Sequence, residues 1–487
     1  MAASERSGTG QSGLLQQLTR RKPPAMLVAD ASDSVGGLKR ALRAWDLTAL
    51  GIGAIIGAGI FVLTGVGAHY AGPSLIVSFA ASGFACAMAA LCYAEFAAMI
   101  PIAGSAYSYS YTTMGELVAW IIGWDLVLEY AVGAAAVAAG WSGYLRVMLD
   151  GVGIHLPLTL SHAPGSHPGA IINLPALLIV ILISAVLYIG ISESARLNSA
   201  IVAIKLVVVA VVILVGIFFV KPSNWSPFAP FGWSGTMKSA AVIFFAYIGF
   251  DAVSTAAEEV VDPKRDLPLG ILGSLFICTL LYILVTAVLT GMVPYQIIDV
   301  SAPLASAFAH RGLNAISGLI SLGAVAGLTS VLLVLLLGQS RIFFAMSRDG
   351  LLPPAFSKVH PRFRTPYIPT VITGAAVAIA ASLLPIQEIA ELANIGTLFA
   401  FVLVCLGVWI LRVTEPEMRR PFSTPLVPLV PILGVVCCGY LMSQLPWLTW
   451  IRFFGWLAAG LVIYLAYGRW HSRVSETTAK PAKAANL

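Results

Sequence analysis

Five ionisable side chains lie inside long apolar stretches of this sequence, where a charge is costly. Asp125 and Glu129 stand four residues apart in GWDLVLEYA, Lys205 lies in NSAIVAIKLVVV, Asp251 is in mid-stretch, and Glu95 lies toward the end of another stretch. A charge at the centre of a bilayer costs about 3 kcal/mol on insertion scales, so such residues carry protons, bind charged solutes or join helices as ion pairs. We expect Lys205, Glu129 and Asp251 to act in function, and Asp125 and Glu95 to be structural ion-pair residues.

The second unusual feature is glycine within apolar sequence. The stretch from Gly51 to Gly65 reads GIGAIIGAGIFVLTG and holds five glycines. Glycines in a membrane helix allow either close helix packing or a break in the helix. A second candidate break, at Gly249 in VIFFAYIGFDAVSTAAEEV, lies five apolar blocks later. Interrupted segments at corresponding positions of two halves are typical of inverted-repeat transporters, which bind substrate at the breaks.

The elements that hold these residues are long apolar helices. Of the 487 residues, 59% are hydrophobic and 10% are charged, and the mean hydropathy is +0.90. Apolar blocks of this length predict membrane helices rather than barrel strands. The sequence therefore predicts an all-α polytopic membrane protein with twelve spans, at about 46–69, 73–100, 117–147, 173–192, 195–219, 237–260, 268–292, 313–340, 366–384, 388–411, 426–445 and 449–469.

The basic residues predict the orientation. With both termini inside, 22 of the 28 Lys and Arg face the cytoplasm, five face outside and Lys205 lies within a span. This asymmetry follows the positive-inside rule and predicts cytoplasmic tails at 1–44 and 470–487 of a cell-membrane protein. The net charge of +6 therefore reflects topology and indicates no nucleic-acid partner. The six cysteines all lie in apolar blocks, without disulfide or metal-ligand spacing, and we expect no metal or cofactor.

Five sequence blocks resemble the amino acid–polyamine–organocation superfamily, and most closely the bacterial relatives of the cationic amino acid transporters. They are LTALGIGAIIGAGIFVLTG, AEFAAMIPIAGSAYSYSY, GWDLVLEYAV, FFAYIGFDAVSTAAEEVVDPKRDLPLGI and QSRIFFAMSRDGLLP, and the resemblance runs from about Trp45 to about Gly468. It implies the leucine-transporter fold, with inverted repeats at 45–219 and 237–411, two further helices at 426–469 and broken spans 1 and 6.

The resemblance also implies where an amino acid binds. Its carboxylate and amine would meet the first break, and its amine would meet carbonyls of the second. Glu129 lies close to the site in the family, Asp251 is a further candidate for binding an amine, and Phe244, Phe245 and Tyr247 are candidates for an aromatic lid. The matching backbone positions are Ile55, Ile56, Gly57, Ala58 and Gly59 in the first break, and Phe245, Ala246, Tyr247 and Ile248 in the second.

Two positions depart from the pattern of many relatives. Ala58 replaces the Ser or Thr that many members carry, which leaves backbone N–H groups to bind the carboxylate. Leu335 stands where cationic members are expected to have a smaller, more polar residue. A guanidinium needs polar partners once it leaves water. We therefore expect small neutral amino acids such as alanine as substrates, with arginine and lysine as alternatives.

Lys205 matches the position at which proton-coupled relatives replace a sodium ion with a lysine. The resemblance thus implies proton–amino acid symport, with Lys205 contacting span 1 carbonyls near Gly57 and Glu129 as a second proton carrier. An amino acid exchanger and a polyamine or organic-cation carrier, in which Glu129 and Asp251 pair with amines, remain alternatives. A membrane enzyme or sensor is disfavoured because no catalytic or cofactor motif is present. The expected partners are an amino acid, protons and the lipid bilayer, and a small single-span subunit is compatible with the sequence.

Overall fold

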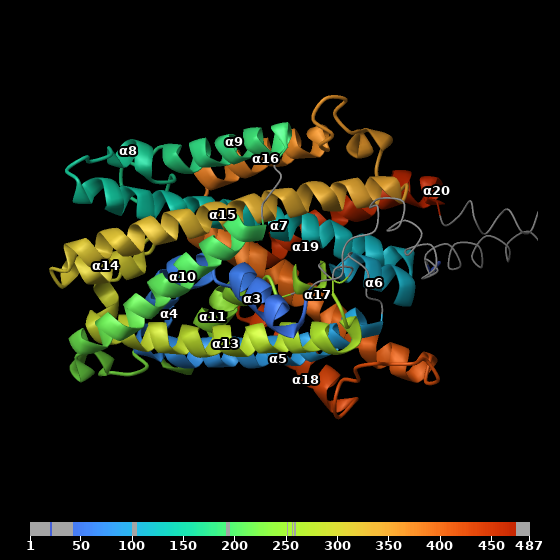
Figure 1. Ribbon diagram of the computed structural model, residues 1–487, viewed down its shortest axis with the longest axis horizontal. Helices are drawn as coiled ribbons and strands as arrows, with labels where there is room; N and C mark the ends of the chain where they lie inside the picture. The colour runs from blue at the N-terminus through green and yellow to red at the C-terminus, as the bar shows by residue number, and fades with distance from the viewer. Residues whose placement is uncertain are drawn as a thin grey trace, which may run out of the picture.

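The computed structural model describes residues 20–21, 42–99, 105–190, 195–250, 252–255, 257 and 260–473. Within these residues the secondary structure is helical apart from two isolated bridges, Leu42 with Val260 and Ser161 with Asn173. The helices run mostly along one common direction, and α15 (Asn314–Arg348) crosses beside α7 (Glu116–Gly151) through the middle of the molecule (Figure 1). This is the all-helical architecture that the apolar blocks predict.

Most of the remaining helices lie within the predicted blocks, whereas the short helices α6, α8 and α14 lie between blocks and α20 follows the last one. Their bounds are α3 Ala44–Ile55, α4 Thr64–Ala71, α5 Leu75–Met99, α6 Ser105–Thr113, α8 Leu158–Ser161, α9 Leu174–Ile189, α10 Ala195–Gly216, α11 Gly232–Ile243, α12 Ala252–Thr255, α13 Pro263–Met292, α14 Pro303–His310, α16 Tyr367–Leu383, α17 Ile386–Thr414, α18 Leu429–Ser443, α19 Trp447–Ile463 and α20 Arg469–His471.

Seven helical segments of the described chain are long and apolar enough to cross a membrane. They are Gly59–Met99, Glu116–Gly151, Ala200–Phe219, Pro263–Met292, Asn314–Arg348, Ile386–Thr414 and Trp447–His471. Four apolar helices, namely α3, α9, α16 and α18, are shorter. With 12 to 17 residues they extend about 18–26 Å, against a hydrocarbon core of about 30 Å. The protein is a polytopic membrane protein, and twelve crossings remain a prediction.

Helix α7 is the most enclosed of these segments, because 83% of its apolar 18-residue stretch is buried. Its middle reads AVGAAAVAAG, and such small side chains let neighbouring helices approach closely. A methyl group on Gly140 would lie 2.2 Å from Val62 Cγ2, and one on Gly143 would lie 2.5 Å from Ser301 Cβ. Since α15 and α17 also pack on α7, this helix lies in the interior of the bundle.

Glu95 has the structural role that the sequence predicts for it. Its carboxylate is 1% exposed and accepts hydrogen bonds from Arg412 Nε at 3.0 Å and Nη2 at 2.9 Å. Arg420 Nε lies 3.2 Å away, and the Thr424 backbone N–H donates at 2.8 Å. Glu95 thereby fixes the loop between α17 and α18 to α5.

We predict that Glu95→Gln lowers the free energy of unfolding by about 3 kcal/mol, because it removes the buried counter-ion of Arg420, whose side chain is 7% exposed, and of the partly exposed Arg412. The measurement is the thermal unfolding of the purified protein in detergent. Glu388→Gln is the control, because Glu388 pairs with Arg452 at 2.8 Å where both side chains are substantially exposed, and such pairs contribute about 1 kcal/mol or less. Equal melting temperatures for the two variants would contradict the role of Glu95.

Candidate functional site

The first apolar block is interrupted in its middle. Helix α3 ends at Ile55, Ile56 has an extended backbone at φ −73° and ψ 95°, and a π-helical segment begins at Gly59. The five residues from Ile55 to Gly59 are buried. The last carbonyls of α3 and the first N–H groups of the next segment therefore lack helical partners away from bulk water. The N–H end suits an anion, and the carbonyl end suits a cation.

The second interruption lies in the corresponding block of the second half. Helix α11 ends at Ile243, a 3₁₀ turn covers Phe244–Tyr247, and Ile248 is extended at φ −62° and ψ 139°. Gly249 has φ +113°, a conformation that favours glycine. A methyl group on Gly249 would lie 2.9 Å from the Ala54 carbonyl oxygen, so this turn packs on the end of α3. Asp251 lies outside the described residues.

The two interruptions touch each other. A methyl group on Gly59 would lie 2.3 Å from the Ala246 Cα atom, which shows that only a glycine fits between the two backbones. The Tyr282 hydroxyl, from α13, lies 2.8 Å from both the Ile55 and the Ala246 carbonyl oxygens. Its single proton is donated to these two carbonyls, one in each interruption. Sequence reasoning did not select Tyr282, although a phenol in mid-block was a signal that could have found it.

Lys205 contacts the first interrupted block. Its side chain is 2% exposed, and Nζ donates to the Gly53 carbonyl oxygen at 3.0 Å. A methyl group on Gly327 of α15 would lie 3.0 Å from the lysine stem, so the side chain runs between α3, α10 and α15. The carbonyl is one turn earlier than the expected region near Gly57. The reason is that α3 ends at Ile55, which removes the helical N–H partner of the Gly53 carbonyl.

The three aromatic lid candidates face different neighbours. The Tyr247 hydroxyl donates to the Phe79 carbonyl oxygen on α5 at 2.7 Å, and the Phe244 ring packs against Phe401 of α17 at a centroid distance of 5.7 Å. Phe245 instead faces α7, because a methyl group on Gly133 would lie 3.1 Å from its ring and 3.6 Å from Leu335 Cδ1. The structure therefore brings Phe245 and Leu335 to one face of α7.

That face of α7 continues toward the acids. Glu129 is one helical turn before Gly133, and Asp125 is one turn before Glu129, so the three positions share a face. Both acids are buried. The structure thus places Glu129 within one turn of the residue that contacts Phe245.

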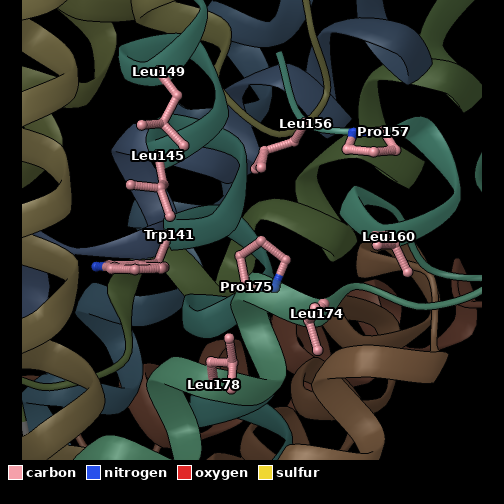
Figure 2. Close-up of a pocket in the computed structure, with 9 residues that line it drawn as sticks. All are labelled: Trp141, Leu145, Leu149, Leu156, Pro157, Leu160, Leu174, Pro175 and Leu178. Atoms are coloured by element: carbon pink, nitrogen blue, oxygen red, sulfur yellow. The ribbon is translucent and has the colours of Figure 1, made fainter. Parts of the chain in front are cut away.

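A separate cavity of about 280 Å³ lies toward the C-terminal end of α7 (Figure 2). Its lining residues are apolar and none comes from the interrupted segments: Trp141, Leu145, Leu149, Leu156, Pro157, Leu160, Leu174, Pro175 and Leu178. The Trp141 Nε1–H donates to Thr329 Oγ1 at 3.0 Å and is therefore occupied. These walls provide no partner for a charged solute, so this cavity is not a candidate site for one.

Comparison with known proteins identifies the family. A profile described as amino acid permease matches residues 42–464. The chain belongs to this family. A methylthioribose transporter of Bacillus subtilis (strain 168) is 50% identical over 463 residues, which cover 95% of this chain and 100% of the relative. The branched-chain amino acid permease BcaP of the same organism is 50% identical over 460 residues, covering 94% and 99%. The human cationic amino acid transporter 4 is 32% identical over 95% of this chain and 92% of its own length.

Membership of the amino acid permease family accounts for the class of protein. These relatives are transporters and permeases, and this chain is likewise a membrane transporter rather than an enzyme. The match spans both interruptions as well as Lys205, Glu129 and Tyr282. The family thus covers the whole candidate site.

We predict that Gly59→Ala lowers transport by about tenfold or more, because the new methyl group overlaps the Ala246 backbone and such overpacking costs about 1–3 kcal/mol. Uptake of labelled amino acid into proteoliposomes measures the effect. Gly455→Ala on α19 is the matched control, since its new methyl group would meet nothing within 4 Å. Full activity of Gly59→Ala would contradict the close contact between the interruptions.

Tyr282→Phe is expected to weaken substrate binding by about tenfold, because two buried carbonyls lose a donor at a cost of about 1–3 kcal/mol. The readout is the substrate-induced rise in melting temperature across a concentration series. Tyr440→Phe, at a tyrosine that is 44% exposed on α18, should leave that curve unchanged. Unchanged affinity in Tyr282→Phe would mean that its hydroxyl does not organise the site.

Proposed function

We propose that this protein is a proton-coupled symporter of neutral L-amino acids. The observation that carries the proposal is the contact between two interrupted helices, with the Lys205 ammonium on a carbonyl freed by the first interruption. The proposal includes the leucine-transporter fold with inverted repeats at 45–219 and 237–411, further helices at 426–469 and cytoplasmic tails at 1–44 and 470–487. It also includes twelve crossings of the cell membrane.

The interruptions support this fold because they lie in the first and sixth apolar blocks. Fold symmetry of this kind brings the two breaks together near the bilayer midplane. The close approach of Gly59 to Ala246 is the contact that such an arrangement requires. The long helices α7 and α15 then form the packed support beside the site, since they lie against each other over much of their length (Figure 1).

A zwitterion fits the charges at the interruptions. We propose that the carboxylate of the substrate binds the N–H groups of Gly57, Ala58 and Gly59. The ammonium group binds carbonyls of Ile55 and of the second turn, namely Phe245, Ala246, Tyr247 and Ile248. Carbonyl oxygens have two lone pairs, so the bond from Tyr282 leaves Ile55 and Ala246 able to accept a second donor. We propose that the negative charges of Glu129 and Asp251 add to the electrostatic attraction between the site and the ammonium group.

The proposed side-chain pocket is apolar. Phe245 and Leu335 meet at Gly133, and these three residues offer no polar partner to a guanidinium. A pocket of this kind favours neutral side chains such as those of alanine and the branched-chain amino acids. The name of the permease BcaP agrees with this choice, while that of the human relative keeps arginine and lysine as weaker alternatives.

Proton coupling rests on the placement of Lys205. Its ammonium lies where a cation would stabilise the end of α3, and a buried amine that releases its proton leaves the Gly53 carbonyl without a charged partner. We propose that this change loosens α3 from α10 and α15, which opens the site toward the cytoplasm. Glu129 acts as the second proton carrier next to the substrate.

The relative named a methylthioribose transporter supports a second candidate substrate, because it is as similar to this chain as the permease is. A thio-sugar has no carboxylate or ammonium group and would use the apolar pocket and the backbone groups alone. Exchange of one amino acid for another remains the alternative mechanism. A carrier of polyamines or organic cations remains the alternative function.

We predict that an inward proton gradient drives accumulation of labelled alanine and leucine into proteoliposomes without sodium, and that Lys205→Met abolishes this accumulation. Arginine and methylthioribose, tested alongside, should accumulate less. Lys221→Met is the control, because Lys221 is exposed.

Uptake that requires internal amino acid and ignores the gradient would identify an exchanger instead. Gradient-driven accumulation that persists in Lys205→Met would remove Lys205 from the coupling mechanism. Preferential uptake of methylthioribose would replace the proposed substrate class.

A further inference from the structure

Asp125 contradicts the expectation that it is a structural ion-pair residue. Its side chain is 0% exposed in the middle of α7. Within the part of the chain that the structure describes, neither carboxylate oxygen has a hydrogen-bond partner and no ion pair reaches it. Glu95, the other acid with that expectation, has two arginines. Asp125 therefore has an environment that no structural role explains.

Asp125 packs against Gly396 on α17. A methyl group on Gly396 would lie 2.5 Å from Asp125 Oδ1. The same turn of α7 is anchored on its other side, because Trp124 Nε1 donates to the Trp456 carbonyl at 2.8 Å and Trp456 Nε1 donates to the Trp124 carbonyl at 3.0 Å. Asp125 is thus held on a fixed turn and pressed against α17.

Several ionisable groups of the elements that pack against α7 have other partners. On α17, Glu391 accepts hydrogen bonds from Tyr70 and Thr449, and Arg412 binds Glu95. Arg452 of α19 pairs with Glu388.

On α15, Arg341 is exposed, although its neighbour Gln339 donates to the Val127 carbonyl at 3.0 Å. Tyr107 of α6 donates to Asp349. Tyr188 of α9 and Tyr367 of α16 contact each other at a centroid distance of 6.4 Å. On α7 itself, Glu129 lies one turn away and carries the same sign of charge. Arg348, also on α15, has a buried Nε without a hydrogen-bond partner, but neither carboxylate oxygen of Asp125 bonds to it or to any other described residue.

Burying the ionised form of an unpaired acid is energetically costly. Such an acid is therefore either protonated or in contact with water. The neutral acid fits against Gly396, whereas the ionised form requires water between α7 and α17. Helix α17 also faces the second interruption, since Asn394 Nδ2 donates to the Val242 carbonyl and Phe401 packs on Phe244 and Phe250. A movement of α17 away from Asp125 would therefore also change the substrate site.

We propose that Asp125 is a proton-carrying residue of the transport cycle, protonated while α17 packs on it and ionised when α17 separates. The inference rests on the proposed function, because it supplies a further coupling group for the proposed symport. The proton comes from water on the side where substrate enters, forms an O–H bond with a carboxylate oxygen of Asp125, and returns to water on the other side. No other bond changes.

Asp125→Asn tests the proposal because it keeps the shape of the acid and cannot ionise. Wild-type protein, Asp125→Asn and the control Asp150→Asn are compared in proteoliposomes containing a pH-sensitive dye, with labelled alanine. Asp150 is an exposed acid at the end of the same helix. We expect Asp125→Asn to retain exchange of external for internal alanine and to carry about one proton fewer per substrate than the wild type. Asp150→Asn should match the wild type.

An unchanged proton-to-alanine ratio in Asp125→Asn, beside a proton-coupled wild type, would overturn this inference and leave the proposed function standing. A wild type that shows no proton coupling at all would overturn both. If Asp125→Asn does not fold, the double variant Asp125→Ala with Gly396→Ala replaces it, because the new methyl group occupies space left by the carboxylate. The expected loss of one proton, and the result that overturns it, are the same.

Discussion

The structure depends on one constraint, which is that a backbone group freed inside a membrane has no water to bind. Two helices are interrupted here, and each interruption frees carbonyls in a buried region. Tyr282 donates to one carbonyl from each interruption, and Lys205 donates to the Gly53 carbonyl. Because these donors come from α13 and α10, the interruptions are stable only within the assembled bundle. The same polar groups are what a substrate with two opposite charges can use.

Helix α7 provides the surface on which this arrangement rests. Its small residues let Val62 and the Phe245 ring approach the helix axis closely, at Gly140 and Gly133. The same face carries Glu129 and Asp125 at successive turns. The proposed transport cycle requires the interrupted segments to rearrange against a support, and the enclosed helix α7 is placed to provide that support.

Three of the acids in apolar helices, Glu95, Asp125 and Glu129, show how strongly packing decides a role. Glu95 and Asp125 are both buried carboxylates in apolar sequence, yet Glu95 has Arg412 and Arg420 while Asp125 has the backbone of Gly396. Glu129 lies one turn from Gly133 and hence near Phe245. An ion pair in a low-dielectric region holds segments together, whereas an unpaired acid is sensitive to any movement that admits water.

The sequence by itself determined the class of protein, the helical blocks and the places where two of them are interrupted, because hydropathy and glycine content act locally along the chain. It also pointed to Lys205, whose charge is conspicuous within an apolar block. Only the tertiary structure decided which carbonyl Lys205 reaches, that Tyr282 joins the two interruptions, and that Tyr247 turns toward α5 while Phe245 turns toward Leu335. It likewise separated Glu95 from Asp125. These outcomes depend on residues far apart in the sequence, since a partner for a buried polar group is supplied by whichever helix packs beside it.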